Sequence, residues 1–227
     1  MSASRPDLNV VSDPAHAVGD LLAEQARRGG SIVLTGGSSV GRAYERAAAG
    51  EPDWSRVTLW WGDERCVPPD DERSNFGLAK ATLLDHLSSP PREVHRIRGE
   101  LRPPEAADEL DRELEGAALD LLLLGLGPDG HVASLFPGSP QLAVEDRRAT
   151  SGPPGLEPYV ERVTMTMPVL QSASRVVFIV SGEDKADAVA RAFGGDATRD
   201  VPASLVRLAS APVEVFLNEA AATRLPR

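Results

Sequence analysis

The sequence has few of the residues that would indicate a disulfide scaffold, a metal cluster or a membrane span. It contains 1 cysteine, Cys66, so an internal disulfide is excluded, and its 4 histidines show no metal-site spacing. Its longest apolar stretches, 117–126 and 176–180, are too short to cross a bilayer. The first residues lack the basic-then-apolar layout of a secretory signal. We therefore expect a cytoplasmic protein without a metal.

Positive charge is also scarce. The 24 basic residues are outnumbered by 34 acidic ones, the net charge is −10, and only Lys80 and Lys185 are lysines. Such an acidic body repels nucleic acid and anionic membranes unless a basic patch is segregated, and the sequence shows no such patch. Its 227 residues, 41% of them hydrophobic, have an ordinary globular composition. We expect a single domain over residues 1–227, a small-molecule partner, and a monomer or weak homodimer.

Short apolar runs alternate with helical patterns along the chain. Apolar runs predict strands at 8–11, 31–35, 57–61, 120–124, 163–165, 175–180 and 213–217. Periodic patterns predict a helix that starts at Asp13-Pro14, and further helices near 40–48, 75–87, 104–116 and 184–193. Strands separated by helices indicate a doubly wound α/β fold, Rossmann-like, with a mostly parallel sheet and helices on both faces. The polar segment 145–158 is expected to be a loop long enough to cover a site.

The first candidate site loop is glycine-rich and follows the strand predicted at 31–35. Glycines let a backbone approach a ligand closely, and the helix that follows offers free N–H groups to an anion. Gly36, Gly37 and Ser38 are therefore candidates for binding phosphate. The alternative is a tight turn in which Ser38 caps the next helix.

The second loop places charged residues directly after a buried strand. Asp63, Glu64 and Arg65 follow Trp61, and charges in such a place must be solvated, paired or used. The Arg65 guanidinium suits a phosphate or carboxylate, and the alternative is a local ion network without a ligand. Cys66 has no histidine near it in sequence and is interpreted as a packing residue.

The third loop, 125–131, follows the strand predicted at 120–124 and contains a histidine. His131 can exchange a proton near neutral pH, and Asp129, two residues before it, can fix its tautomer. This pattern predicts a general base, although a single histidine is more often structural.

Two short motifs in these loops match patterns whose wider context is missing. Residues 125–130 read G-x-G-x-x-G, but Pro137-Gly138 interrupts the long helix that a dinucleotide site requires. Residues 37–41 read G-x-S-x-G, which would make Ser39 the nucleophile of an α/β-hydrolase. No histidine follows His131, whereas that fold takes its histidine late in the chain. The hydrolase reading is kept as a minor alternative.

Together the loops resemble the 6-phosphogluconolactonase family, which is similar to the glucosamine-6-phosphate isomerase/deaminase group. The matching pieces are LTGGSS (34–39), WWGDERCVPPDDERSNF (60–76), LLLGLGPDGHVASLFPGSP (122–140), RVTMTMPVL (162–170), GEDKADAV (182–189) and VPAS (201–204). The resemblance implies hydrolysis of 6-phospho-D-glucono-1,5-lactone in the oxidative pentose phosphate pathway, without cofactor or metal. It implies that His131 activates water, that Asp129 orients His131, and that Gly36, Gly37, Ser38, Arg65 and Lys185 bind the phosphate.

Two departures and two alternatives accompany the resemblance. The family's glycine loop commonly continues Ser-Thr-Pro, whereas this chain has Ser39-Val40 after Ser38. The related deaminases continue past their histidine with a glutamate that assists ring opening, and this chain has Phe136 there. We therefore favour the lactonase. The alternatives are an isomerase/deaminase, in which Asp63 would be a secondary proton carrier, and a non-catalytic sugar-phosphate sensor.

Overall fold

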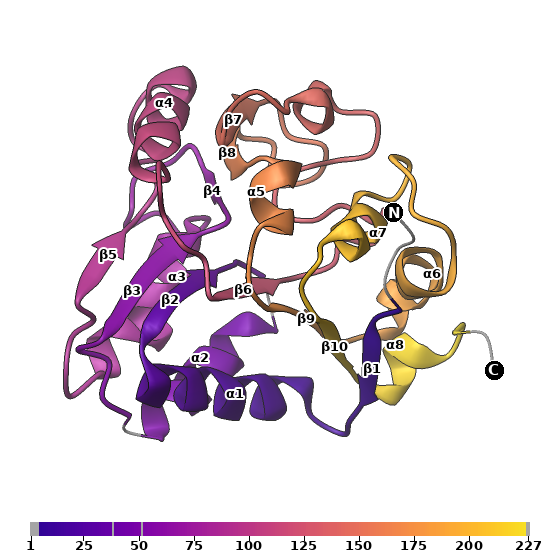
Figure 1. Ribbon diagram of the computed structural model, residues 1–227, viewed down its shortest axis with the longest axis horizontal. Coiled ribbons are helices and arrows are strands. Elements are labelled where there is room, and N and C mark those ends of the chain that lie inside the picture. The colour runs from indigo at the N-terminus through magenta and orange to yellow at the C-terminus, as the bar shows by residue number, and fades with distance from the viewer. Residues whose placement is uncertain (1–4, 38, 51, 226–227) are drawn as a thin grey trace.

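A seven-stranded parallel sheet forms the centre of the molecule (Figure 1). The structure, a computed structural model, describes residues 5–37, 39–50 and 52–225. The strand order across the sheet is β1 (Asp7–Val10), β10 (Val213–Leu217), β9 (Val176–Val180), β6 (Leu121–Leu124), β2 (Gly30–Leu34), β3 (Val57–Trp61) and β5 (Glu93–His95). The central strands β6 and β9 are buried along their whole length, as their apolar sequences predict.

Helices α1 (Pro14–Arg28) and α2 (Val40–Ala49) lie together below the sheet in Figure 1. The predicted start of α1 is confirmed, because Asp13 Oδ1 accepts from the backbone N–H groups of Ala15 and His16 at 3.1 and 3.2 Å. Gly29, with φ of 80°, ends α1 in a conformation that favours glycine.

The other helices are short. The α-helices are α3 (Asn75–Thr82), α4 (Pro103–Glu113), α5 (Met167–Gln171), α6 (Ala186–Val189), α7 (Pro202–Leu205) and α8 (Glu219–Ala222). The 3₁₀ turns are η1 (Leu84–His86), η2 (Pro140–Ala143), η3 (Glu183–Lys185) and η5 (Val206–Leu208), and η4 (Ala190–Gly194) is a π-turn. The helix predicted at 184–193 is thus three consecutive pieces, η3, α6 and η4. The helix predicted at 75–87 ends at Thr82 and continues only as η1.

A second, antiparallel sheet was not predicted. It has the order β4 (Asp63–Arg65), β8 (Arg162–Met165), β7 (Ala149–Gly152), and it lies beside α4 and α5 above the main sheet (Figure 1). The predicted strand 163–165 therefore exists, but outside the parallel sheet. The predicted loop 145–158 is wrong in part, because β7 lies within it.

The predicted class, a doubly wound α/β fold around a parallel sheet, is confirmed. The loops that leave β2, β3 and β6 emerge at the carboxyl edge of the sheet, where open α/β sheets bind ligands. The β4–β8–β7 sheet extends the wall above this edge. Among the helices described, none is long and apolar enough to span a membrane.

Candidate active site

A cavity of about 570 Å³ opens at the carboxyl edge of the sheet. Its wall includes Gly36 and Gly37 after β2, Arg65 in β4, His131 after β6 and Lys185 after β9. The structure therefore brings together these five predicted residues, which come from four segments that are far apart in sequence. Asp63, predicted as a secondary residue, also lines the cavity. Ser38 lies outside the residues that the structure describes.

Asp129 fixes the orientation of the His131 ring. His131 Nδ1 lies 2.6 Å from Asp129 Oδ1, and the same oxygen accepts from the His131 backbone N–H at 3.1 Å. A carboxylate beside Nδ1 keeps the proton on that nitrogen, which leaves Nε2 with a lone pair. Nε2 is therefore the atom that can take a proton from water.

The surroundings of this pair favour a charged Asp129. Burial raises the pKa of Asp129, but the hydrogen bond and the charge of His131 outweigh that effect, and the pKa lies below its usual value. The ring of Phe136 covers His131 at a centroid distance of 4.5 Å. Gly127 permits the close approach of the imidazole, because a Cβ there would lie 1.9 Å from His131 Nδ1.

The glycine loop is fixed by a buried tyrosine and by Asn75. Tyr44 is fully buried, and its hydroxyl donates to Thr35 O at 2.7 Å and accepts from Thr35 N–H at 3.0 Å. These bonds satisfy the backbone of Thr35 after it has left the β2 ladder. A Cβ at Gly36 would lie 1.9 Å from Asn75 Oδ1, so only glycine fits at position 36. Both contacts set the path of the backbone along the cavity wall.

Glu64 anchors β4 to the start of α3. Its carboxylate accepts from the backbone N–H groups of Arg65, Asn75 and Phe76 at 2.7, 2.7 and 2.8 Å, and from Ser74 Oγ at 3.0 Å. Burial raises the pKa of Glu64 in spite of these donors. Glu64 therefore supports the strand that carries Arg65 rather than contacting a ligand itself.

Arg162 is a site residue that the sequence reasoning did not identify. It is the cross-strand partner of Arg65 in the β4–β8 pair, so both side chains point to the same face, and both line the cavity. Arg162 donates to the backbone carbonyls of residues 156, 158 and 160, and neither arginine has an ion-pair partner among the described residues. Burial and the nearby charge of Arg65 lower the pKa of Arg162. Two like charges in register repel each other, which suits an anion between them.

Lys185 adds a third cationic group. It lies at the end of η3, directly after β9, and its side chain is partly buried beside Asp184, whose Oδ2 lies 3.4 Å from Nζ. Arg65, Arg162 and Lys185 thus gather in one cavity of an acidic protein, where Asp63 and Glu157 are the acidic residues of the lining.

The turn that follows His131 is strained and closely held. Ala133 has φ of 50°, a left-handed conformation that costs a non-glycine residue about 1–2 kcal/mol. The next residue, Ser134, donates through Oγ to Asp63 Oδ2 at 2.6 Å. Asp63 Oδ1 accepts from Asn75 Nδ2 at 3.3 Å. Asp63 therefore contacts both the turn that follows His131 and the first residue of α3.

The structure does not support the competing motif readings. Ser39 lines the cavity, but its backbone has φ −84° and ψ −16°, an ordinary helical conformation and not the strained turn of a nucleophile elbow. The glycines of residues 125–130 lead into turns and not into a long helix. Burial raises the pKa of the Cys66 thiol to about 11, so it stays protonated near neutral pH. Within the described residues, no group of three His, Cys, Asp or Glu is placed to hold a metal ion.

Fold and cavity together define an α/β protein with a pocket lined by Arg65, Arg162 and Lys185 and with a histidine–carboxylate pair beside it. The model of the family described as glucosamine-6-phosphate isomerases/6-phosphogluconolactonase matches residues 9–215. The chain belongs to this family, and the predicted resemblance is confirmed.

Individual relatives agree with this assignment. The 6-phosphogluconolactonase of Mycobacterium tuberculosis is 38% identical over 87% of this chain and 87% of its own length. The human 6-phosphogluconolactonase is 35% identical over 99% of this chain and 96% of its own. The crystal structure of 6-phosphogluconolactonase from Leishmania guyanensis covers 95% of this chain and 97% of its own, with a TM-score of 0.83 and 26% identity. These names agree with the prediction of a lactonase enzyme.

Proposed function

We propose that the protein hydrolyses 6-phospho-D-glucono-1,5-lactone to 6-phospho-D-gluconate by His131-assisted attack of water. The observation that carries the proposal is the presence, in one cavity, of the Asp129-oriented imidazole and of two arginines, Arg65 and Arg162, that have no carboxylate partner among the described residues. The names of the relatives support the substrate class. A phosphorylated lactone has the two features that such a cavity can recognise: a dianion and an ester carbonyl at a distance from it.

The first step is to hold the phosphate. Arg65 and Arg162 point into the cavity from adjacent strands, Lys185 lies on its wall, and the backbone of Gly36 and Gly37 is free of side chains. Charge-assisted bonds from guanidinium groups to phosphate are short and directional, so they orient the rest of the sugar. Positioning of this kind places the lactone carbonyl near His131.

The chemical step is a general-base hydrolysis. His131 Nε2 takes a proton from water as the water oxygen bonds to C1 of the lactone, and the carbonyl oxygen becomes an oxyanion. Asp129 stabilises the imidazolium that forms. When the oxyanion collapses, the bond from C1 to the ring oxygen breaks, and His131 returns its proton to that oxygen. The product is the open-chain acid, which loses its carboxylic proton to solvent.

Phe136 argues against the isomerase/deaminase alternative. Its ring packs on His131 and has no proton to exchange, whereas the related deaminases are expected to use a glutamate in this segment. In that alternative Asp63, which lines the cavity, would carry the proton, and release of ammonia from glucosamine 6-phosphate is the assay that would reveal it.

The test compares lactone opening by the wild-type protein and by His131→Ala. Hydrolysis releases acid, so the rate above spontaneous opening is followed with a pH indicator. Loss of the base is expected to lower kcat about 10²- to 10⁴-fold. His86→Ala is the matched control, because His86 is an exposed histidine of η1 outside the cavity. Equal rates for wild type and His131→Ala would contradict the mechanism.

The proposed substrate also bears on location. A phosphate dianion does not cross a lipid bilayer unaided. The proposal therefore places the enzyme in the cytoplasm, together with the reactions that form and use phosphorylated sugar acids.

A further inference from the structure

Ser134 connects the His131 turn to the sheet that carries the two arginines. Its Oγ donates to Asp63 Oδ2 at 2.6 Å, and its backbone N–H donates to Thr164 Oγ1 at 3.3 Å. Asp63 and Thr164 are cross-strand partners in β4 and β8. Ser134 is 1% exposed and lies behind the cavity wall, so it acts on a bound ligand only through its neighbours.

The residues that Ser134 joins share one face of the small sheet. Residues two apart in a strand point the same way, so Asp63 lies on the same face as Arg65, and Thr164 on the same face as Arg162. Ser134 reaches the acceptors at one end of this face, and the guanidinium groups occupy the other. The position of His131 relative to the arginines therefore depends on the bonds of Ser134.

The strain at Ala133 makes these bonds necessary. A non-glycine residue stays in the left-handed region only where its surroundings fix it there. The turn is closed by the bond from Leu135 N–H to Val132 O at 2.9 Å, and Ser134 fixes it to β4 and β8. Without the bond to Asp63, Ala133 is free to relax, and the imidazole three residues from Ser134 moves with the turn.

We propose that Asp63 and Ser134 are positioning residues, whose hydrogen bond holds His131 in place relative to Arg65, and that Asp63 transfers no proton in the reaction. This inference rests on the proposed lactone hydrolysis. Both carboxylate oxygens of Asp63 are engaged, Oδ2 by Ser134 and Oδ1 by Asn75. Asn75 in turn lies against Gly36, so this single carboxylate links the histidine turn, the arginine strand and the glycine loop.

The first expected result is a change in kcat without a change in KM. Displacement of a reacting group by about 1 Å can cost roughly 10²-fold in rate, so Ser134→Ala is expected to lower kcat about 10- to 100-fold. KM should stay near the wild-type value, because Arg65, Lys185 and the glycine loop are untouched. A purely structural role would lower the melting temperature and leave kcat at the wild-type value, and that result would overturn the inference.

Two substitutions of Asp63 separate positioning from proton transfer. Asp63→Asn keeps an oxygen that can accept from Ser134 Oγ, so it should retain most of kcat and the shape of the pH profile. Asp63→Ala should lose as much as Ser134→Ala, and the double variant should lose no more than either alone. If Asp63 carries a proton, Asp63→Asn will lose as much as Asp63→Ala and one limb of the pH profile will disappear. That outcome would contradict our assignment.

Ser31→Ala is the matched control. Ser31 is also a buried serine bonded to an aspartate, since its Oγ accepts from Asp120 N–H at 2.9 Å, but it lies at the opposite end of β2. The Ser31→Ala variant should have a lower melting temperature and an unchanged kcat.

The imidazole NMR signals of His131 give a second readout that needs no turnover. They should shift in Ser134→Ala and stay unchanged in Ser31→Ala, whether or not the lactone is the substrate. Unshifted signals in Ser134→Ala would overturn the inference, whereas a wild-type protein without turnover would overturn only the proposed function.

Discussion

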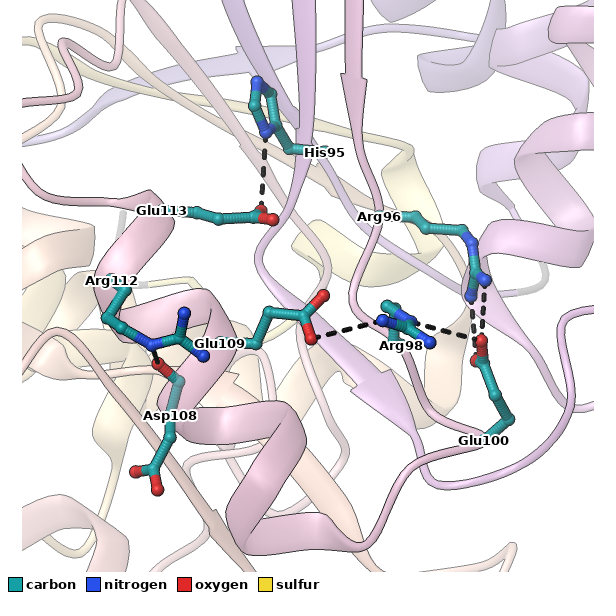
Figure 2. A network of polar contacts seen from close by, with 8 residues as sticks. All are labelled: His95, Arg96, Arg98, Glu100, Asp108, Glu109, Arg112 and Glu113. Atoms are coloured by element: carbon teal, nitrogen blue, oxygen red, sulfur yellow. Dashed lines mark hydrogen bonds and ion pairs between the residues drawn. The ribbon is translucent and has the colours of Figure 1, made fainter.

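Two charge-rich regions of the molecule differ in whether their arginines form ion pairs with carboxylates. Between β5 and α4, Arg96 and Arg98 each pair with a glutamate (Figure 2). Arg96 donates twice to Glu100, at 2.6 and 2.8 Å, and Arg98 lies 3.4 Å from Glu109. In the cavity wall, Arg65 and Arg162 oppose each other without an ion-pair partner among the described residues. Paired charges support the scaffold, whereas the like charges in register lie where we propose that the phosphate binds.

The largest effect expected from this comparison concerns Arg65. Hydrogen bonds to charged groups are worth about 1.5–3 kcal/mol, so Arg65→Gln should lower kcat/KM for the phosphorylated lactone about 10- to 100-fold. On the same lactone without its phosphate, Arg65→Gln and the wild-type protein should have equal kcat/KM. An equal loss on both substrates would show that Arg65 supports the pocket as a whole, and the contrast between the two regions would fail.

A smaller effect is expected from inorganic phosphate on stability. A ligand at ten times its Kd stabilises the native state by about 1.4 kcal/mol, which raises Tm by roughly 3–6 °C for a chain of this length. Thermal unfolding with and without phosphate measures this shift. It should disappear in Arg65→Gln and persist in Arg98→Gln, in which a paired arginine of the other region is replaced. Loss of the shift in both variants would contradict a localised anion site.

The smallest effect is a pH-dependent change in stability, and it is expected for the arginine–glutamate pairs between β5 and α4. The hydrogen bonds from Arg96 lower the pKa of Glu100 to about 2. Because this value lies below that of the unfolded chain, the pair stabilises the fold above about pH 4.5 and loses this contribution as the pH falls toward 2. The pair lies at the surface with both side chains partly exposed, so Glu100→Gln should cost about 1 kcal/mol at pH 7. Urea unfolding from pH 7 to pH 3 should show the difference shrinking, and a constant difference would contradict the assignment.

Sequence patterns predict the parts of the fold that depend on neighbouring residues. The strands of the main sheet at 31–35, 57–61 and 120–124 are apolar enough to be recognised locally, within a residue or so of their ends. β4 is not predicted because its three residues are all charged, and β7 is not predicted because its four residues do not form an apolar run. Both strands are stabilised by pairing with β8, which lies far from β4 in sequence and follows β7 after the segment 153–161.

The residues of the candidate site also fall into those that local sequence motifs predict and those that they do not. The glycine loop, Arg65 and the Asp129–His131 pair lie in short motifs, and each motif suggests its own chemistry. Arg162 and Ser134 acquire their roles only through the β4–β8 register and through a bond between residues 71 positions apart. Arg162 does lie in the quoted segment RVTMTMPVL, but nothing in that segment shows that it faces Arg65.

The place of β1 at the edge of the main sheet has a consequence for how the chain acquires its structure during synthesis. Within the part of the chain that the structure describes, β1 pairs only with β10, with Asp7 opposite Glu214, so β1 has no partner in the sheet until β10 has been synthesised. At typical translation rates this takes roughly 10–40 s. During that time the exposed side chains of Leu8 and Val10 are available to chaperones or to other nascent chains, and the rate of translation bears on the yield of native protein.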